Sequence, residues 1–206
     1  MKDRDTFEIL LDYPKKHNLD YDTNNNHQRF CLLPSDQFLK TKFVIFKRNN
    51  LFFLAYDSFA SKAYTSKTFT GVYGLIDLPT ETELRIFKKD WSDFFLRMNK
   101  RKTRNPFLDR NITIVSKSNK LPKGLFSINM VSQFIDLSKK ITPIELIIEH
   151  DYISLIKELK GKMIVGIETN DWIYKESDID VFLNYGDKIL DSIIKNASTQ
   201  QCIHGL

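Results

Sequence analysis

Residues 38–59 read FLKTKFVIFKRNNLFFLAYDSF, with an aromatic and β-branched run on each side of Asn49 and Asn50. Runs of this composition are typical of β-strands. Asparagine adopts positive φ more readily than most residues, so an Asn-Asn pair between two such runs predicts a tight hairpin turn. The segment therefore predicts two antiparallel strands joined at residues 49–50.

The same composition continues on both sides of this hairpin. Residues 29–34 and 64–78 are further expected strands, and Gly71 and Gly74 in the longer one predict a β-bulge or a close approach of the backbone. Ahead of the strands, residues 6–17 have the apolar spacing of an amphipathic helix. The first half is thus expected to be a helix followed by an antiparallel meander.

The second half alternates strand and helix patterns. The strands are expected at residues 82–89, 111–117, 143–150 and 162–168. The helices are expected at residues 90–98, after a Ser127 cap, between an Asp151 cap and Gly161, and around Ile189, Leu190 and Ile193. Residues 196–206 are expected to fray. The whole pattern predicts an α+β fold, either as two subdomains (residues 1–104 and 105–206) or as one continuous domain.

The composition is that of a globular protein. Of 206 residues, 42% are hydrophobic and 28% charged, and 16 Phe, 8 Tyr and 2 Trp supply large side chains for a core, which excludes disorder of the whole chain. Two distant cysteines do not suggest a disulfide framework. The first 20 residues mix charges into their apolar run, and no apolar stretch approaches the roughly 18 residues of a membrane span. A soluble, cytoplasmic protein is expected.

Charge is unevenly distributed along the chain. The net charge is +5, yet residues 85–123 alone hold 12 basic and 3 acidic side chains, a net of +9, while residues 143–206 hold 6 basic and 11 acidic ones, a net of −5. A concentration of positive charge of this kind is typical of a binding surface for an anionic partner. The alternative is a solvated loop, because charge runs are common on surfaces.

Six side chains in this basic window are the candidate ligand-binding residues: Arg97, Lys100, Arg101, Lys102, Arg104 and Arg110. They suit phosphates of a nucleic acid, an acidic protein surface or an anionic membrane surface. The acidic residues 143–206 are a further possible partner, within one chain or through self-association of two copies.

Asp178 and Asp180 in SDIDVFL (residues 177–183) are the candidate catalytic residues. Their interval from Gly166 resembles that in nucleotidyltransferases, where a Gly-Ser turn precedes two metal-binding aspartates. The resemblance implies that these carboxylates hold Mg²⁺. The metal ion would then clamp a triphosphate and activate a hydroxyl. Ile167 stands where that family has a serine, and only 26 residues follow Asp180, too few for a third carboxylate on a later strand.

The same stretch also fits the start of a helix. With Ser177 as the N-cap, Asp178 and Asp180 occupy the first turn, where negative charge favours the positive end of the helix dipole. Ile179, Phe182 and later apolar residues then form one stripe. This interpretation requires no metal.

Another candidate is an acid/base cluster at the ends of neighbouring expected strands. Glu149 and Glu168 lie there, with His150 beside them. No nucleophile accompanies them, and the sequence contains no complete catalytic set. We therefore expect a non-enzymatic binding or interaction protein that uses a basic surface and needs no cofactor. A minimal nucleotidyltransferase-like enzyme dependent on Mg²⁺ is the alternative, and it requires Asp178 and Asp180 to lie on a strand facing a cleft.

Overall fold

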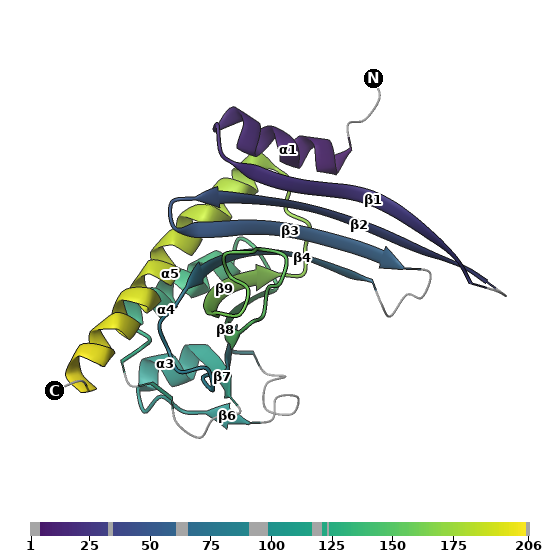
Figure 1. Ribbon diagram of the computed structural model, residues 1–206. Helices are drawn as coiled ribbons and strands as arrows, with labels where there is room; N and C mark the ends of the chain where they lie inside the picture. The colour runs from purple at the N-terminus through teal and green to yellow at the C-terminus, as the bar shows by residue number, and fades with distance from the viewer. Residues whose placement is uncertain are drawn as a thin grey trace.

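One antiparallel sheet organises the molecule (Figure 1). The computed structural model describes residues 5–32, 35–60, 66–90, 99–116, 121–122 and 124–204. Within these residues the sheet has nine strands in the order β1-β2-β3-β4-β9-β8-β5-β7-β6. The strands are β1 (Tyr21–Leu32), β2 (Ser35–Arg48), β3 (Leu51–Ala60), β4 (Lys67–Leu75), β5 (Leu84–Lys88), β6 (Lys100–Arg101), β7 (Ile112–Ser116), β8 (Ile144–His150) and β9 (Met163–Thr169).

The helices cover one face of this sheet. They are α1 (Thr6–Lys16), α3 (Pro106–Asn111), α4 (Ile128–Ser138) and α5 (Glu176–His204). In Figure 1, α5 runs diagonally behind the strands, and β1 to β3 extend well beyond it. None of the helices in the described part of the chain is both long and apolar enough to cross a membrane.

The predicted hairpin is confirmed at the residue level. Asn49 has a φ of 56°, and Arg48 pairs with Leu51 across the turn. Because the strand period is two, this turn fixes which side chains of β2 and β3 face the helices. The meander β1-β2-β3-β4 follows from it.

The expected bulge at Gly71 is wrong. Gly71 pairs without interruption with Leu54 on one side and Glu168 on the other. Its hydrogen side chain instead leaves room for the ring of Tyr73, which is fully buried and would collide with a Cβ at residue 71. The glycine therefore serves side-chain packing within a regular strand.

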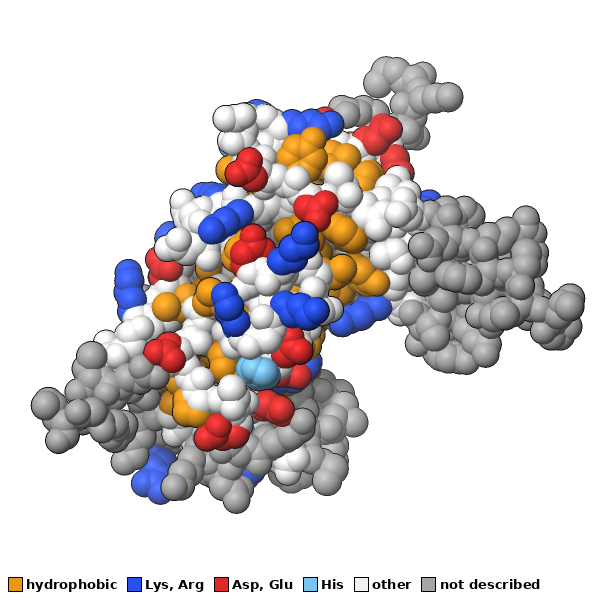
Figure 2. Space-filling model, viewed as in Figure 1, with side chains coloured by type: hydrophobic (Ala, Val, Ile, Leu, Met, Phe, Trp, Pro, Cys, Tyr) orange, Lys and Arg blue, Asp and Glu red, His pale blue; other side chains and the backbone are white. Residues whose placement is uncertain are grey.

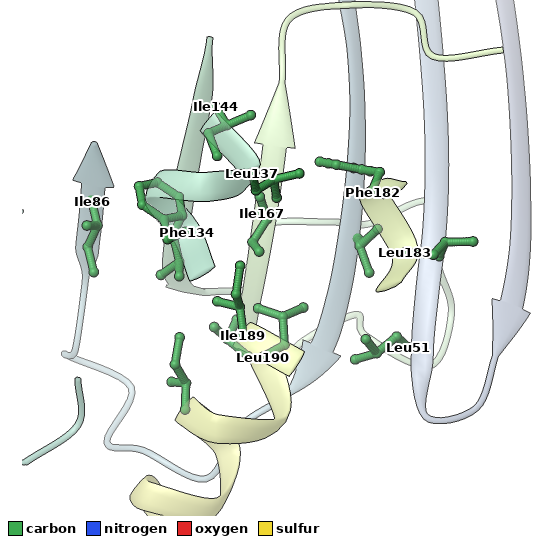
Figure 3. Close-up of a cluster of buried hydrophobic side chains, with 14 of the residues drawn as sticks. Leu51, Ile86, Phe134, Leu137, Ile144, Ile167, Phe182, Leu183, Ile189 and Leu190 are labelled. Atoms are coloured by element: carbon green, nitrogen blue, oxygen red, sulfur yellow. The ribbon is translucent and has the colours of Figure 1, made fainter. Parts of the chain in front are cut away.

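The main core lies between the helices and the sheet. In Figure 3, Phe134 and Leu137 of α4 and Phe182 of α5 lie against strand residues such as Ile86 and Ile167. These side chains are at most 1% exposed. The Ser127 hydroxyl caps α4, as predicted, by accepting a hydrogen bond from the N–H of Met130 at 3.1 Å.

The connection between β8 and β9 differs from the expected helix. Residues 151–162 form an irregular loop that joins two antiparallel neighbours, so its ends must lie close together. Asp151 Oδ1 accepts from the N–H of Gly161 at 2.7 Å and closes the loop. Ile153, Ile156 and Leu159 are buried at intervals of three residues against the face of the sheet away from the helices.

The last helix is longer than expected at both ends. α5 begins at Glu176 and continues to His204, where fraying was expected. Its apolar stripe faces the core, and interior Gly186 lets the helix approach β4 closely, because a Cβ there would lie 3.3 Å from Val72 Cγ1. The residues expected to form a helix at 90–98 lie almost wholly outside the described part of the chain.

The α+β fold with an N-terminal helix and an antiparallel meander is thus as predicted. Strands from both expected subdomains pair within one sheet, since β4 pairs with β9 and β5 pairs with β7. The division at residues 104/105 stays a prediction.

Candidate functional site

The first two residues of the basic segment after residue 99 belong to the sheet. Lys100 and Arg101 form β6 and pair with Val115 and Ile114 of β7. The N–H of Ser116 also donates to the carbonyl of Asn99 at 3.2 Å. Within the described residues, these contacts place the segment at the edge of the sheet opposite β1.

Hydrogen bonds fix the loop between β6 and α3. Asp109 Oδ1 accepts from the N–H and from the hydroxyl of Thr103, both at 2.8 Å. Asn105 Oδ1 caps α3 by accepting from the N–H of Phe107 at 3.0 Å. Between them, Arg104 has a φ of 66°, in the left-handed region that costs an L-residue about 1 kcal/mol. The loop therefore holds Arg104 in a backbone conformation that arginine does not favour.

A hollow of about 590 Å³ opens beside this loop. Its basic side consists of Arg101, Lys102 and Arg104. Its other side is largely apolar: Leu121 and Pro122 are half-buried, and behind them lie the buried side chains of Leu108, Leu125 and Phe126. The described lining contains no carboxylate, although Asp109 bonds to the lining residue Thr103. Three cationic side chains therefore lie beside an apolar wall. We call this feature the basic hollow.

The basic hollow brings together half of the six predicted basic residues. Arg101, Lys102 and Arg104 line it, whereas Lys100 and Arg110 are exposed nearby on β6 and α3. Arg97 lies outside the described residues. The apolar wall was not part of the prediction, because it comes from residues 121–126 and from α3.

Arg85, the first residue of the basic window, is engaged within the chain. Its Nη1 lies 3.3 Å from Glu145 Oε1, and its Nη2 lies 3.2 Å from Glu149 Oε2. These ion pairs join the basic window to the acidic residues 143–206 on one sheet face. Figure 2 shows acidic and basic side chains interspersed on the side of the molecule that it displays.

Asp178 and Asp180 lie at the start of α5, not on a strand. Residues two apart on an α-helix project about 200° apart around its axis, so the two carboxylates diverge. The predicted Ser177 cap is wrong, because α5 begins at Glu176 and the N–H of Asp178 already donates to the carbonyl of Lys175 at 3.0 Å. The geometry that a magnesium-dependent pair requires is not formed by these residues.

Asp180 instead joins α5 to α1. Its Oδ1 accepts from the hydroxyl of Tyr13 at 2.7 Å, and Lys16 Nζ lies 2.6 Å from Glu176 Oε1. Burial and the Asp180 carboxylate raise the pKa of Tyr13 above its ordinary value, so the hydroxyl stays a donor. The two contacts connect the first helix to the first turns of the last one.

A buried carboxylate on the opposite sheet face has a different environment. Glu168 is only 4% exposed and accepts hydrogen bonds from the hydroxyls of Tyr73 and Tyr152, the latter at 3.0 Å. Burial raises its pKa, whereas the two tyrosine hydrogen bonds lower it. A glutamate within the apolar run KMIVGIE was a visible signal, but Tyr73, 95 residues away, could not be identified as its partner.

The expected acid/base cluster is not assembled. Glu149 pairs with Ile164 and Glu145 pairs with Glu168, so Glu149 and Glu168 lie four strand positions apart, roughly 13 Å. Glu149 bonds to Arg85, and His150 Nε2 contacts the carbonyl of Gly161 at 3.2 Å. The three residues therefore have separate partners.

Comparison of the chain with protein-family models, curated proteins and solved structures finds no match.

Proposed function

We propose that this chain is a non-enzymatic binding protein of the cytoplasm whose basic hollow receives an acidic segment of a partner protein. The observation that supports this most is the composition of the hollow, with three cations on one side and aliphatic side chains on the other. Protein interfaces combine an apolar centre with a charged rim in the same way. The preferred segment has acidic residues around one apolar side chain.

A protein segment suits the hollow better than a nucleic acid does. Nucleic acids are held by phosphate contacts along an extended track and by stacking on aromatic rings. The hollow is confined to about 590 Å³, and its wall is mainly Leu and Pro, with Phe126 9% exposed. A volume of this size accommodates one or a few side chains.

Fluorescence anisotropy distinguishes the two partner classes. The probes are a labelled Glu-rich peptide with a central leucine, the same peptide with alanine at that position, and single- and double-stranded oligonucleotides. We expect saturable binding of the leucine peptide, weakened by salt and by the leucine-to-alanine change, since both the charges and the apolar wall contribute.

Two results would reject the proposal. One is absence of saturable peptide binding at low ionic strength. The other is tighter binding of oligonucleotides than of the peptide, with the steep salt dependence that counterion release produces, which would assign the surface to nucleic acid.

A further inference from the structure

The two edges of the sheet are built very differently. β6, at one edge of the sheet formed by the described residues, consists there of two residues, both basic. Short length and positive charge are the usual protection of an edge against pairing with another strand. β1, at the other edge of the described sheet, has 12 residues in unbroken register with β2, without a bulge. Its residues 21–26 contain no Lys, Arg or Pro.

The backbone groups of β1 alternate between β2 and the open side. The carbonyl of Asp20 accepts from the N–H of Lys47 at 3.4 Å, and the register places these residues opposite each other. Hydrogen-bonded pairs alternate with non-bonded pairs in an antiparallel ladder. Every second residue after Asp20 therefore points its N–H and C=O toward β2, namely Asp22, Asn24 and Asn26.

Tyr21, Thr23 and Asn25 consequently point their backbone groups away from the sheet. Thr23 agrees with this, because its N–H donates to the neighbouring Asp22 Oδ1 at 2.8 Å and not to β2. The side chains of all three residues are exposed, and Tyr21 is 42% exposed. In Figure 1, β1 is the outermost strand of the long arm.

We propose that β1 pairs antiparallel with β1 of a second copy of this chain, which joins two sheets across a two-fold axis at Thr23. In this register Thr23 faces its own copy, and Tyr21 faces the second copy's Asn25. These are the residues whose backbone groups point outward, so each pair can form ladder hydrogen bonds. At Thr23 the N–H exchanges Asp22 Oδ1 for the carbonyl of the second copy's Thr23.

The side chains of β1 are compatible with this pairing. Asp22 is the single charged residue between 21 and 26, and it lies opposite the second copy's Asn24, whose amide is a donor for the carboxylate. No like charges meet within this stretch. A two-fold axis repeats each of these contacts, so the Asp22 and Asn24 pair occurs twice.

Amide hydrogen exchange followed by NMR at low and high protein concentration tests this inference. At low concentration we expect fast exchange at Tyr21 and Asn25 and slow exchange at Asn24 and Asn26, which bond to β2. At high concentration all four should be slow, and the sedimenting mass should approach twice the 24.2 kDa of the chain. Fast exchange at Tyr21 and Asn25 with an unchanged mass at every concentration would reject the proposal. Slow exchange at Tyr21 and Asn25 without a change in mass would also reject the proposal, because these amides would then be protected within a single copy of the chain.

Thr23→Pro and Thr23→Ala form a matched pair for the same measurement. Proline removes an N–H that points away from β2, whereas alanine keeps it, and both lose the threonine side chain. We expect the proline variant alone to raise the dimer dissociation constant, by about tenfold or more, because symmetry doubles the lost hydrogen bonds. Equal association of the two folded variants would rule out pairing through this edge. If the proline variant does not fold, the concentration dependence of amide hydrogen exchange in the unchanged protein still tests the pairing.

Discussion

At the residue scale, Arg104 shows how a basic side chain is placed beside the hollow at a cost in backbone energy. Its φ of 66° is maintained by the Thr103–Asp109 hydrogen bonds and by the Asn105 cap. Residues kept in sparsely populated conformations are frequent at binding sites. The strain therefore agrees with a role of Arg104 in binding.

Replacing Arg104 with glycine should stabilise the fold. Glycine adopts positive φ without steric cost, so we expect Arg104→Gly to raise the free energy of unfolding by about 0.5–1 kcal/mol. Arg110→Gly is the control, because glycine within helix α3 should lower it by about 1 kcal/mol. Chemical denaturation measures both. Destabilisation by both variants would contradict the strain assigned to Arg104.

Glu168 should make stability depend on pH. Burial raises its pKa above the ordinary value of 4.5, so the folded protein keeps a proton that the unfolded chain has lost. The contribution of Glu168 to the free energy of unfolding is fully present below pH 4.5. This contribution is lost as the pH rises through the raised pKa of the folded state. The Glu168→Gln variant has no carboxyl group to titrate at this position. Its free energy of unfolding should therefore rise relative to that of the unchanged protein as the pH increases from 4.5 through the raised pKa.

Denaturation at a series of pH values measures this difference, with Glu149→Gln as a control on the same sheet face. A constant difference between Glu168→Gln and the unchanged protein would show that Glu168 titrates normally.

Single residues were predictable where the cause is local. Asn49 in the hairpin and Ser127 at the start of α4 act on neighbours within a few positions. Gly71 was misread, because its partner is the Tyr73 ring and the strand itself is regular. The pairing of Tyr73 with Glu168 depends on the sheet order, which local patterns do not contain.

At the element scale, α1 and α5 are joined through Tyr13 and Asp180. This contact gives Asp180 a structural role that Asp178 does not share, although only Ile179 separates them in the sequence. Asp178 is exposed, and its Oδ1 accepts from the Ser177 hydroxyl at 3.2 Å. The two aspartates should therefore respond differently to the loss of Tyr13.

A double-mutant cycle tests this difference. Tyr13→Phe and Asp180→Ala should show a coupling of about 1.5–3 kcal/mol in the free energy of unfolding, the range for a hydrogen bond to a charged group. Tyr13→Phe with Asp178→Ala should show no coupling. Similar coupling in both cycles would mean that the Tyr13 hydroxyl does not select Asp180.

Apolar spacing and a cap together predicted α4 correctly, but the same two signals were not sufficient elsewhere. Residues 151–162 have a cap, apolar spacing and a terminal glycine, yet form a loop, because β8 and β9 are antiparallel neighbours. β6 was missed because two basic residues carry no strand pattern. In both cases the partner strands decide the local structure.

At the scale of the whole molecule, the fold brings residues 101–108 and 121–126 together around one hollow. The charge of residues 85–123 was visible in the sequence, and half of the six candidate cations line the basic hollow. Arg85 belongs to the same basic stretch of sequence, but its ion pairs with Glu145 and Glu149 on the sheet face could not be predicted from charge alone. The apolar wall depends on tertiary packing and could not be predicted.

In the proposed function the basic hollow, and not the net charge of the protein, binds the acidic segment. The most direct measurement compares Lys102→Glu/Arg104→Glu with Lys157→Glu/Lys160→Glu, which changes the net charge equally at exposed positions of the 151–162 loop. With the labelled leucine peptide, we expect the first double variant to weaken binding about tenfold or more and the second to change it little, since close charges act most strongly. Equal weakening by the two double variants would contradict the assignment of the hollow as the binding site.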